Sequence, residues 1–97
     1  DSQLFIKRGE IEFTAENIDN VKHLNFYING ENITVKNGKT VKLEAKNNDI
    51  IEISGSGFEE MAILRVTSVS DNVTVPEPGK VIYINNNLVL VDRVRIK

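Results

Sequence analysis

A chain of 97 residues without cysteine is long enough for one hydrophobic core, but it offers no disulfide framework and no thiolate metal site. Because 12 basic residues stand against 14 acidic ones, spread along the whole length, the composition argues against a domain that long-range charge draws to nucleic acid or anionic lipid. No apolar run reaches the ~20 residues needed to cross a bilayer, so we expect no membrane insertion of this segment.

The apolar residues of the chain are mostly β-branched. Ile and Val number 23, whereas Leu, Ala and Met together number 10. Side chains branched at Cβ favour pleated sheet over helix. We therefore expect a single all-β domain spanning residues 1–97. The abundance of Asn, Ile and Lys is also typical of proteins from AT-rich bacterial genomes.

The first part of the chain alternates between apolar and polar residues. Gln3 to Arg8 and Glu10 to Ala15 are predicted as two strands, or as one long strand that bends or bulges at Gly9. The following segment, Glu16 to Lys22, is rich in Asn and Asp and carries few apolar residues. We expect it to form a loop or a single helical turn at one end of the domain.

Two Asn-Gly dipeptides, Asn29-Gly30 and Asn37-Gly38, lie within a nearly unbroken alternation from Leu24 to Ala45. Asn and Gly tolerate the positive φ angles of a tight type I′ turn, and alternating hydrophobic residues around such a pair predict a hairpin. Two hairpins in series would make a meander of three strands. Its buried face would carry Leu24, Phe26, Ile28, Ile33, Val35, Val41, Leu43 and Ala45.

The middle of the chain predicts two further strands around a glycine-containing segment. Ile50 to Ser54 is a short apolar run, in which Ile51 and Ile53 should point inward. Gly55-Ser56-Gly57 is expected to be a flexible connector. Ala62 to Val69 then alternates with apolar residues on both faces, which predicts a central strand covered on both sides.

The last third of the chain predicts a short strand, an interruption and a final hairpin. Val73 to Val75 forms the short strand, and Pro76 to Gly79 cannot continue a ladder because two backbone donors are missing. Lys80 to Asn85 and Leu88 to Lys97 would then pair through a turn at Asn85-Asn86-Asn87.

Short strands at a spacing of about eight to twelve residues, joined by Asn, Gly and Pro turns, indicate a sandwich or a barrel. We expect an immunoglobulin-like antiparallel β-sandwich of about eight to ten short strands, with a small, partly open β-barrel as the alternative. The Cys pair and buried Trp of antibody domains are missing, so the label describes architecture only.

Catalytic residues are not evident in the sequence. His23 is the only histidine, and a triad would need it beside a carboxylate and a hydroxyl such as Ser54 or Ser56. The neighbouring Glu59 and Glu60 are more simply read as solvated charges than as an acid and base pair. We therefore expect no enzyme, and a small hydrolase ranks third among the hypotheses.

Ligand sites for anions or metals are equally unsupported. Gly55-Ser56-Gly57 could hold an anion with its backbone N–H groups, but no helix follows, as phosphate loops require. Calcium is the one metal considered, because sandwich loops often collect oxygen ligands, but Asn and Asp are also the ordinary turn formers. We expect no cofactor and no metal. The calcium candidates are Glu16, Asp19, Asn20, Asn47, Asn48, Asp49, Asp71 and Asn72.

Three positive side chains, Arg93, Arg95 and Lys97, alternate with apolar residues along the terminal strand. Nucleic-acid binding would need more such charge, interleaved with aromatic residues for stacking. We expect instead that this row lies on an edge strand and binds an acidic protein partner. A sugar or small ligand would favour a cleft lined by Tyr27, Tyr83 or Phe58.

The favoured hypothesis is a non-enzymatic β-sandwich module for protein binding, spacing or assembly, whose partner is another protein or a second copy. The alternative is a carbohydrate- or small-ligand-binding module. The chain starts at Asp1 rather than Met, which fits either a trimmed segment or a mature one whose anchor or export signal was removed. We expect an extracytoplasmic location in a bacterial envelope or surface protein, with any tether upstream of residue 1.

Overall fold

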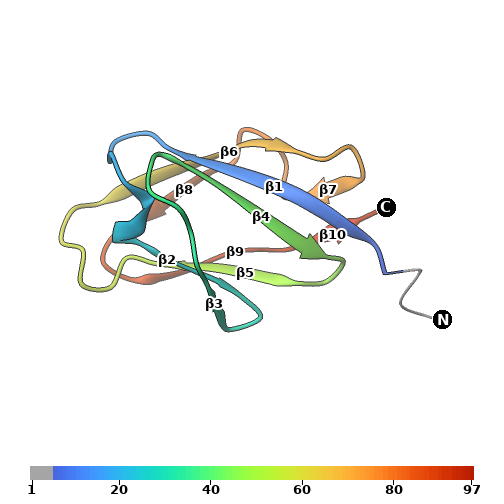
Figure 1. The fold of residues 1–97 in the computed structure, drawn as a ribbon, viewed down its shortest axis with the longest axis horizontal. Helices are drawn as coiled ribbons and strands as arrows, with labels where there is room; N and C mark the ends of the chain where they lie inside the picture. The colour runs from blue at the N-terminus through green and yellow to red at the C-terminus, as the bar shows by residue number, and fades with distance from the viewer. Residues whose placement is uncertain (1–5) are drawn as a thin grey trace.

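The computed structural model describes residues 6–97, and this part of the chain contains ten strands and one short 3-10 helix (Figure 1). Residues 3–5 of the strand predicted from Gln3 to Arg8 lie outside the described residues, and Ile6 and Lys7 precede the first strand. That strand runs through Gly9, and its register shift lies between Glu12 and Phe13, so the bulge predicted at Gly9 was wrong in place. No helix in the described part of the chain is long and apolar enough to span a membrane. The elements are β1 (Arg8–Ala15), η2 (Val21–His23), β2 (Asn25–Ile28), β3 (Glu31–Ile33), β4 (Thr40–Lys46), β5 (Ile50–Ser54), β6 (Ala62–Val69), β7 (Val73–Val75), β8 (Val81–Ile84), β9 (Leu88–Arg93) and β10 (Arg95–Ile96).

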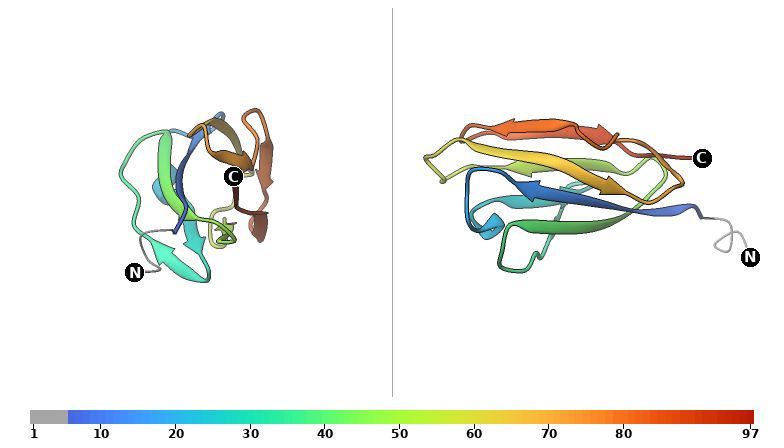
Figure 2. Two further views of the ribbon diagram at one scale, coloured as in Figure 1. Left: turned by 90° about the vertical axis from the view of Figure 1, so that its right-hand side faces the viewer. Right: turned by 90° about the horizontal axis from the view of Figure 1, so that it is seen from above.

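The strands form two four-stranded sheets that face each other, and a small third sheet at one end (Figures 1 and 2). The first sheet has the order β4-β1-β6-β8, the second sheet has the order β3-β2-β5-β9, and β10 pairs with β7. All pairs are antiparallel. The predicted antiparallel sandwich of eight to ten short strands is therefore confirmed, and the two main sheets do not close into a barrel.

The core lies between the two main sheets and is built from the inward residues that alternation predicts. Phe13 of β1 and Phe26 of β2 have no exposed surface, and their ring centroids are 6.3 Å apart. Because β1 and β2 belong to different sheets, this pair joins the two layers. Ile51 and Ile53 of β5 are also fully buried, as predicted.

The predicted strands Ile50–Ser54 and Ala62–Val69 match β5 and β6 in both bounds. The second strand is central, between β1 and β8, and it buries Ala62, Leu64 and Val66. Its other side is open, because Arg65 and Thr67 are exposed. The expectation that both sides of this strand are covered was therefore wrong, since no layer in the described part of the chain packs on the outer face of the first sheet.

The predicted meander is half right. Asn29 and Gly30 have φ angles of 53° and 81°, and they join β2 to its antiparallel partner β3 as a hairpin. Asn37-Gly38 forms no hairpin, because β3 and β4 belong to opposite sheets. The Gly38 carbonyl instead accepts from the Val21 N–H at 2.8 Å. The backbone groups at this turn are used by η2, and the chain crosses from the second sheet to the first.

The predicted final hairpin is also a crossing between sheets. Its first strand, β8, pairs with β6, whereas β9 pairs with β5. Asn86 has a φ of 53°, as a tight turn requires, and its side chain accepts a hydrogen bond from the Gly57 N–H. The terminal strand is divided into β9 and β10, and β10 pairs with β7 of the small sheet. The predicted interruption after Val75 is confirmed.

Asn side chains hold several of the loops by bonding to backbone groups. The Asn17 side chain donates to the Met61 carbonyl at 2.6 Å and accepts from the Ile63 N–H at 2.8 Å. The Asn29 side chain accepts from the Ile50 N–H at 2.9 Å. The high Asn content therefore has a structural use, because an amide can satisfy one donor and one acceptor at a bend.

Candidate functional site

The predicted positive row keeps the alternation that the sequence indicates. Arg93, Arg95 and Lys97 are exposed, whereas Val94 is fully buried and Ile96 is 5% exposed. The row does not lie on one continuous strand, since Arg93 ends β9 and Arg95 begins β10. The Arg95 guanidinium also donates a hydrogen bond to the Asn48 side chain.

The backbone of the last residues is already paired on both sides. The Val94 N–H donates to the Asp49 carbonyl at 2.7 Å, and the Ile96 N–H donates to the Asn47 side chain at 2.8 Å. On the other side, the Lys97 N–H donates to the Asn72 carbonyl at 2.9 Å. A partner strand therefore cannot add along this segment without displacing native bonds. The three cations contribute side chains only, and their binding of a partner stays a prediction.

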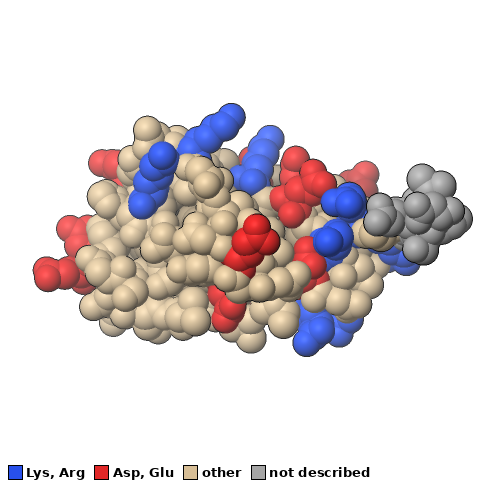
Figure 3. Space-filling model, turned by 60° about the horizontal axis from the view of Figure 1, so that its bottom comes forward, with Lys and Arg blue, Asp and Glu red and all other residues tan. Residues whose placement is uncertain are grey.

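The outer face of the second sheet carries an apolar surface, and no element within residues 6–97 forms a layer over it. The register places Tyr27 of β2, Glu52 of β5 and Leu90 of β9 side by side across three strands. Leu88 and Leu90 are 58% and 63% exposed, although leucine is usually buried. We call Tyr27, Glu52, Ser54, Leu88 and Leu90 the leucine face. Figure 3 shows that uncharged residues cover much of this side of the molecule.

The leucine face is slightly hollowed and ends beside one of the predicted cations. A depression of about 280 Å³ is lined by Tyr27, Gly30, Glu52, Ser54 and Leu88. The register pairs Arg93 with Ile50 at the other end of β9, which places Arg93 at the margin of the same outer face. The surface thus combines apolar side chains with one acidic and one basic group.

Sequence reasoning missed the leucine face for a specific reason. Leu88 to Val91 is a continuous apolar run, and alternation cannot show which residues of such a run point inward. The bulge that separates the two registers of β9 also shifts the pattern after Leu90. Leucine itself gave no signal, because Leu24, Leu43 and Leu64 are buried in the core.

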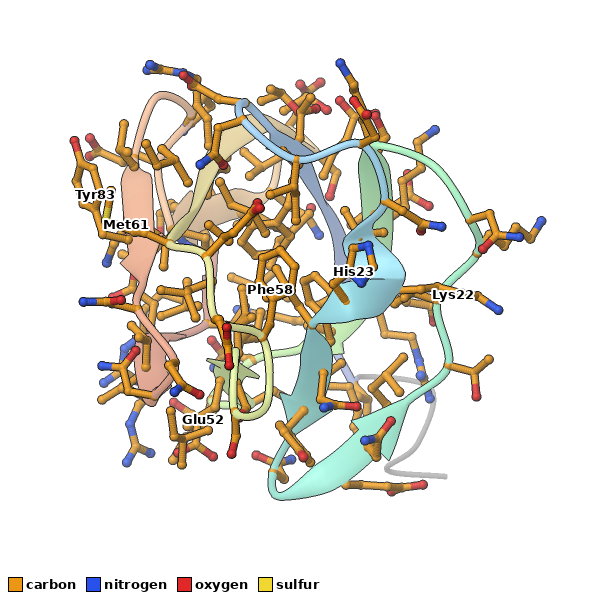
Figure 4. All side chains as sticks on the ribbon, turned by 90° about the vertical axis from the view of Figure 1, so that its left-hand side faces the viewer. Lys22, His23, Glu52, Phe58, Met61 and Tyr83 are labelled. Carbon is orange, nitrogen blue, oxygen red and sulfur yellow. The ribbon has the colours of Figure 1, made fainter. Side chains whose placement is uncertain are left out.

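The three aromatic residues proposed to line a ligand cleft do not meet. Tyr27 lies on the outer face of the second sheet, and Tyr83 is 60% exposed on β8 of the first sheet. Phe58 packs partly against the core and stacks on His23, with ring centroids 4.8 Å apart and planes 13° apart. Figure 4 shows Phe58 and His23 at one end of the sandwich, with Met61 and Tyr83 towards one side. The predicted three-residue cleft is therefore not formed.

The candidate catalytic groups are also separate. The Ser54 hydroxyl accepts a hydrogen bond from the Ser56 N–H at 3.1 Å, and the His23 ring packs on Phe58. Among the hydrogen bonds of residues 6–97, none joins His23 to either serine. Glu59 and Glu60 are exposed. The structure gives His23, Ser54 and Ser56 packing and turn contacts, and among the described residues it does not bring His23 and these serines together as a triad.

The glycine segment is an ordered turn whose backbone donors are occupied. Gly55 donates to the Asn87 carbonyl at 2.9 Å, Gly57 to the Asn86 side chain at 3.0 Å and Phe58 to the Gly55 carbonyl at 2.9 Å. A Cβ atom on Gly55 would lie 2.7 Å from the Ile84 side chain, so close packing requires glycine there. The N–H groups that could have held an anion therefore serve the fold.

Oxygen atoms of several calcium candidates accept hydrogen bonds from donors within the domain. Both carboxylate oxygens of Asp49 accept hydrogen bonds, from the Asn29 side chain and the Lys46 N–H. The Asn20 side chain accepts from the Lys22 N–H at 3.0 Å. The described residues contain no group of three His, Asp or Glu side chains that could hold a metal ion. The loops use their oxygens as turn acceptors.

The chain matches no protein-family model, no curated protein and no solved structure. Its function is therefore inferred from the chemistry of its own surface.

Proposed function

We propose that this domain is a non-enzymatic protein-binding module and that the leucine face is its contact surface. The observation that carries the proposal is the exposure of Leu88 and Leu90 on the edge strand β9, with Glu52 of β5 between Leu90 and Tyr27 and with no covering layer among residues 6–97. Apolar groups gathered on one face, bordered by polar residues, are typical of protein interaction sites. The extracytoplasmic location expected from the sequence belongs to the same proposal.

The energetics support a contact of moderate size. Burying a leucine side chain fully is worth about 1.5–3 kcal/mol, and both leucines have more than half of their surface still exposed. A stable interface covers about 800 Å² on each partner, which is more than five side chains provide. The leucine face would therefore form the apolar centre of the contact, and neighbouring charges such as Arg93 would form part of its rim.

In this proposal, the row of positive side chains on the terminal segment orients an acidic partner as it approaches. Arg93, Arg95 and Lys97 are exposed side chains, so their attraction to an acidic partner would be screened by salt and would mainly speed encounter. Replacing all three with serine should weaken binding at low salt and leave the fold intact. If every partner is bound equally well by this triple variant, the row has no role in binding.

A double variant tests the leucine face directly. Leu88→Ser with Leu90→Ser should abolish partner recovery in a pull-down from the native organism and any self-association seen by sedimentation. The matched control is Tyr83→Ser, which also removes an exposed apolar side chain, but from the other sheet. Circular dichroism checks that all variants are folded. Equal loss of binding in the control, or no loss in the double variant, would refute the proposed surface.

A small-ligand module is the second candidate, favoured by the depression beside Tyr27. Its lining offers an aromatic ring, a carboxylate and a hydroxyl, which is the combination that sugars use for stacking and hydrogen bonding. The depression is shallow, and a protein partner would cover more of the leucine face. A glycan array probed with the wild type and with the Tyr27→Ala variant separates the ligand module from the protein-binding module. Specific glycan binding by the wild type that is lost in the variant would favour the ligand module.

A further inference from the structure

Strand β4 lies at the edge of the first sheet, and half of its backbone groups point away from the sheet. It pairs with β1 on one side only. The Ala15 N–H bonds to the Lys39 carbonyl at 2.7 Å, and the Asn47 N–H bonds to the Lys7 carbonyl at 3.2 Å. Since alternate residues of an edge strand face the neighbouring strand, the odd-numbered residues face β1. The N–H and C=O groups of residues 40, 42 and 44 therefore point to the open side.

The two ends of this open edge are already used by the fold. At one end, the Gly38 carbonyl accepts from the Val21 N–H at 2.8 Å. At the other, the Lys46 N–H donates to the Asp49 carboxylate at 2.7 Å, and the Lys46 carbonyl accepts from the Asp49 N–H at 3.1 Å. Between these ends, the backbone groups of Thr40, Lys42 and Glu44 form no hydrogen bond within residues 6–97. The free stretch is long enough for a short strand.

A groove of about 360 Å³ runs beside this free stretch. Its other wall is the segment that leaves β3 and crosses from the second sheet to the first (Figures 1 and 2). Val41 is buried and Val35 half-buried, so the groove has an apolar floor between polar rims. We call it the β4 groove; it is lined by Thr34, Val35, Lys36, Thr40, Val41 and Lys42.

The rims of the β4 groove are positively charged. Lys36 and Lys42 line it, and Lys22 lines an adjoining depression that shares two of its residues. In the part of the chain that the structure describes, none of these three lysines forms an ion pair.

Two acidic residues on the strands that flank Lys42 have partners outside the groove. Glu44 pairs with Arg8 at 3.5 Å. Glu12, the cross-strand neighbour of Lys42, accepts a hydrogen bond from the Thr67 hydroxyl at 2.6 Å. Neither carboxylate forms an ion pair with Lys36 or Lys42, so a ligand can approach both ammonium groups, and Glu12 keeps its negative charge opposite Lys42.

We propose that the β4 groove binds an extended, acidic segment of a partner protein by adding it as a strand to the first sheet. The backbone of the segment would bond to Thr40, Lys42 and Glu44, and its alternate side chains would point to the Val35–Val41 floor and to the lysine rims. The recognised sequence would thus alternate between apolar and acidic residues. This site goes beyond the proposed function, because it uses a different sheet and a different chemistry from the leucine face.

Two synthetic peptides test the charge preference. One is an end-blocked heptapeptide that alternates aspartate with valine, and the other replaces every aspartate with lysine. The acidic peptide should bind in an NMR titration and slow hydrogen exchange at the amides of Thr40, Lys42 and Glu44 by at least about tenfold, equivalent to ~1.4 kcal/mol. The lysine peptide should not bind. Equal binding of both peptides, no binding of the acidic one, or protection elsewhere would overturn the proposal.

Strand addition is tested separately from charge by N-methylation of the acidic peptide. One version is methylated on its odd-numbered amides and the other on its even-numbered amides, so that only one version loses the donors that face β4. One version should bind like the parent, and the other should lose binding. If both bind equally, the peptide is not held as a strand and the proposal fails.

Matched protein variants locate the site. Lys36→Glu with Lys42→Glu should weaken binding of the acidic peptide by at least about tenfold. Lys46→Glu, on the same strand beyond the groove, should have little effect. The Leu88→Ser/Leu90→Ser variant should bind the peptide like the wild type, so failure of the leucine face and failure of the β4 groove are distinguishable. The exchange measurement is repeated without peptide at several domain concentrations. If hydrogen-exchange protection at the β4 edge rises with concentration, the edge binds a second copy of the domain, and the proposal is overturned.

Discussion

Asp49 lies in the turn between β4 and β5, where the chain passes from the first sheet to the second, and it is 7% exposed. One carboxylate oxygen accepts from the Asn29 side chain at 2.9 Å, and the other accepts from the Lys46 N–H at 2.7 Å. Its backbone carbonyl accepts from the Val94 N–H. This residue therefore ties together the β2–β3 hairpin, the β4–β5 turn and the terminal strand.

Replacement of Asp49 with asparagine should destabilise the domain although the shape of the side chain is kept. Both carboxylate oxygens face donors, whereas an amide offers one acceptor and one donor, so either orientation places two donors against each other. A hydrogen bond to a charged group is worth about 1.5–3 kcal/mol, and we expect Asp49→Asn to cost about 2 kcal/mol. Asp49→Ala loses both bonds and should cost about 4 kcal/mol.

Urea unfolding followed by circular dichroism measures both effects, and an unchanged m-value shows that the change lies in stability. Asp71→Asn is the matched control, because Asp71 lies in an exposed turn and should change stability by less than about 0.5 kcal/mol. If Asp49→Asn unfolds within 0.5 kcal/mol of the wild type, the two hydrogen bonds do not stabilise the turn, and the reasoning fails.

Two further predictions test packing. Val94→Asp should destabilise the domain by several kcal/mol because it buries an unpaired charge, whereas Arg95→Asp should cost less than about 1 kcal/mol; equal costs in a denaturant melt would contradict the alternation of the terminal segment. Gly9→Ala should cost about 1–3 kcal/mol, because the new Cβ would lie 2.3 Å from the Val73 side chain, and Val73→Ala in the same chain should recover part of that loss. Independent, additive effects of Gly9→Ala and Val73→Ala would show that the two residues do not clash.

The sequence alone determined most of the residues that face the core, with the apolar run at the start of β9 as an exception. β-Branched residues at every second position specify the inward side of each strand, and a one-residue shift would expose that whole set. This is why the bounds of β5 and β6 could be predicted, and why Val94 and Ile96 are buried between exposed cations. The Asn29-Gly30 hairpin was also predictable, because two residues join strands that pair directly.

Only the tertiary structure decided which strands are neighbours. The sequence pattern of an inward-facing residue is the same whether the next strand pairs with its strand in one sheet or faces it across the core. Both arrangements bury the same side chain. At Asn37-Gly38 and at Asn85–Asn87 the chain crosses between sheets, although the local turn chemistry suits a hairpin equally well. The apolar faces of the two sheets can bury each other only if the chain crosses from one sheet to the other.

The same limit applies to the candidate sites. Alternation correctly predicted that Arg93, Arg95 and Lys97 are exposed, but only the fold shows that the backbone between them is paired on both sides. The free edge of β4 arises because its expected hairpin partner lies in the other sheet. Side-chain burial follows from local periodicity, whereas an available edge or an uncovered face depends on contacts between segments far apart in the chain, and these are decided by the packing of the whole domain.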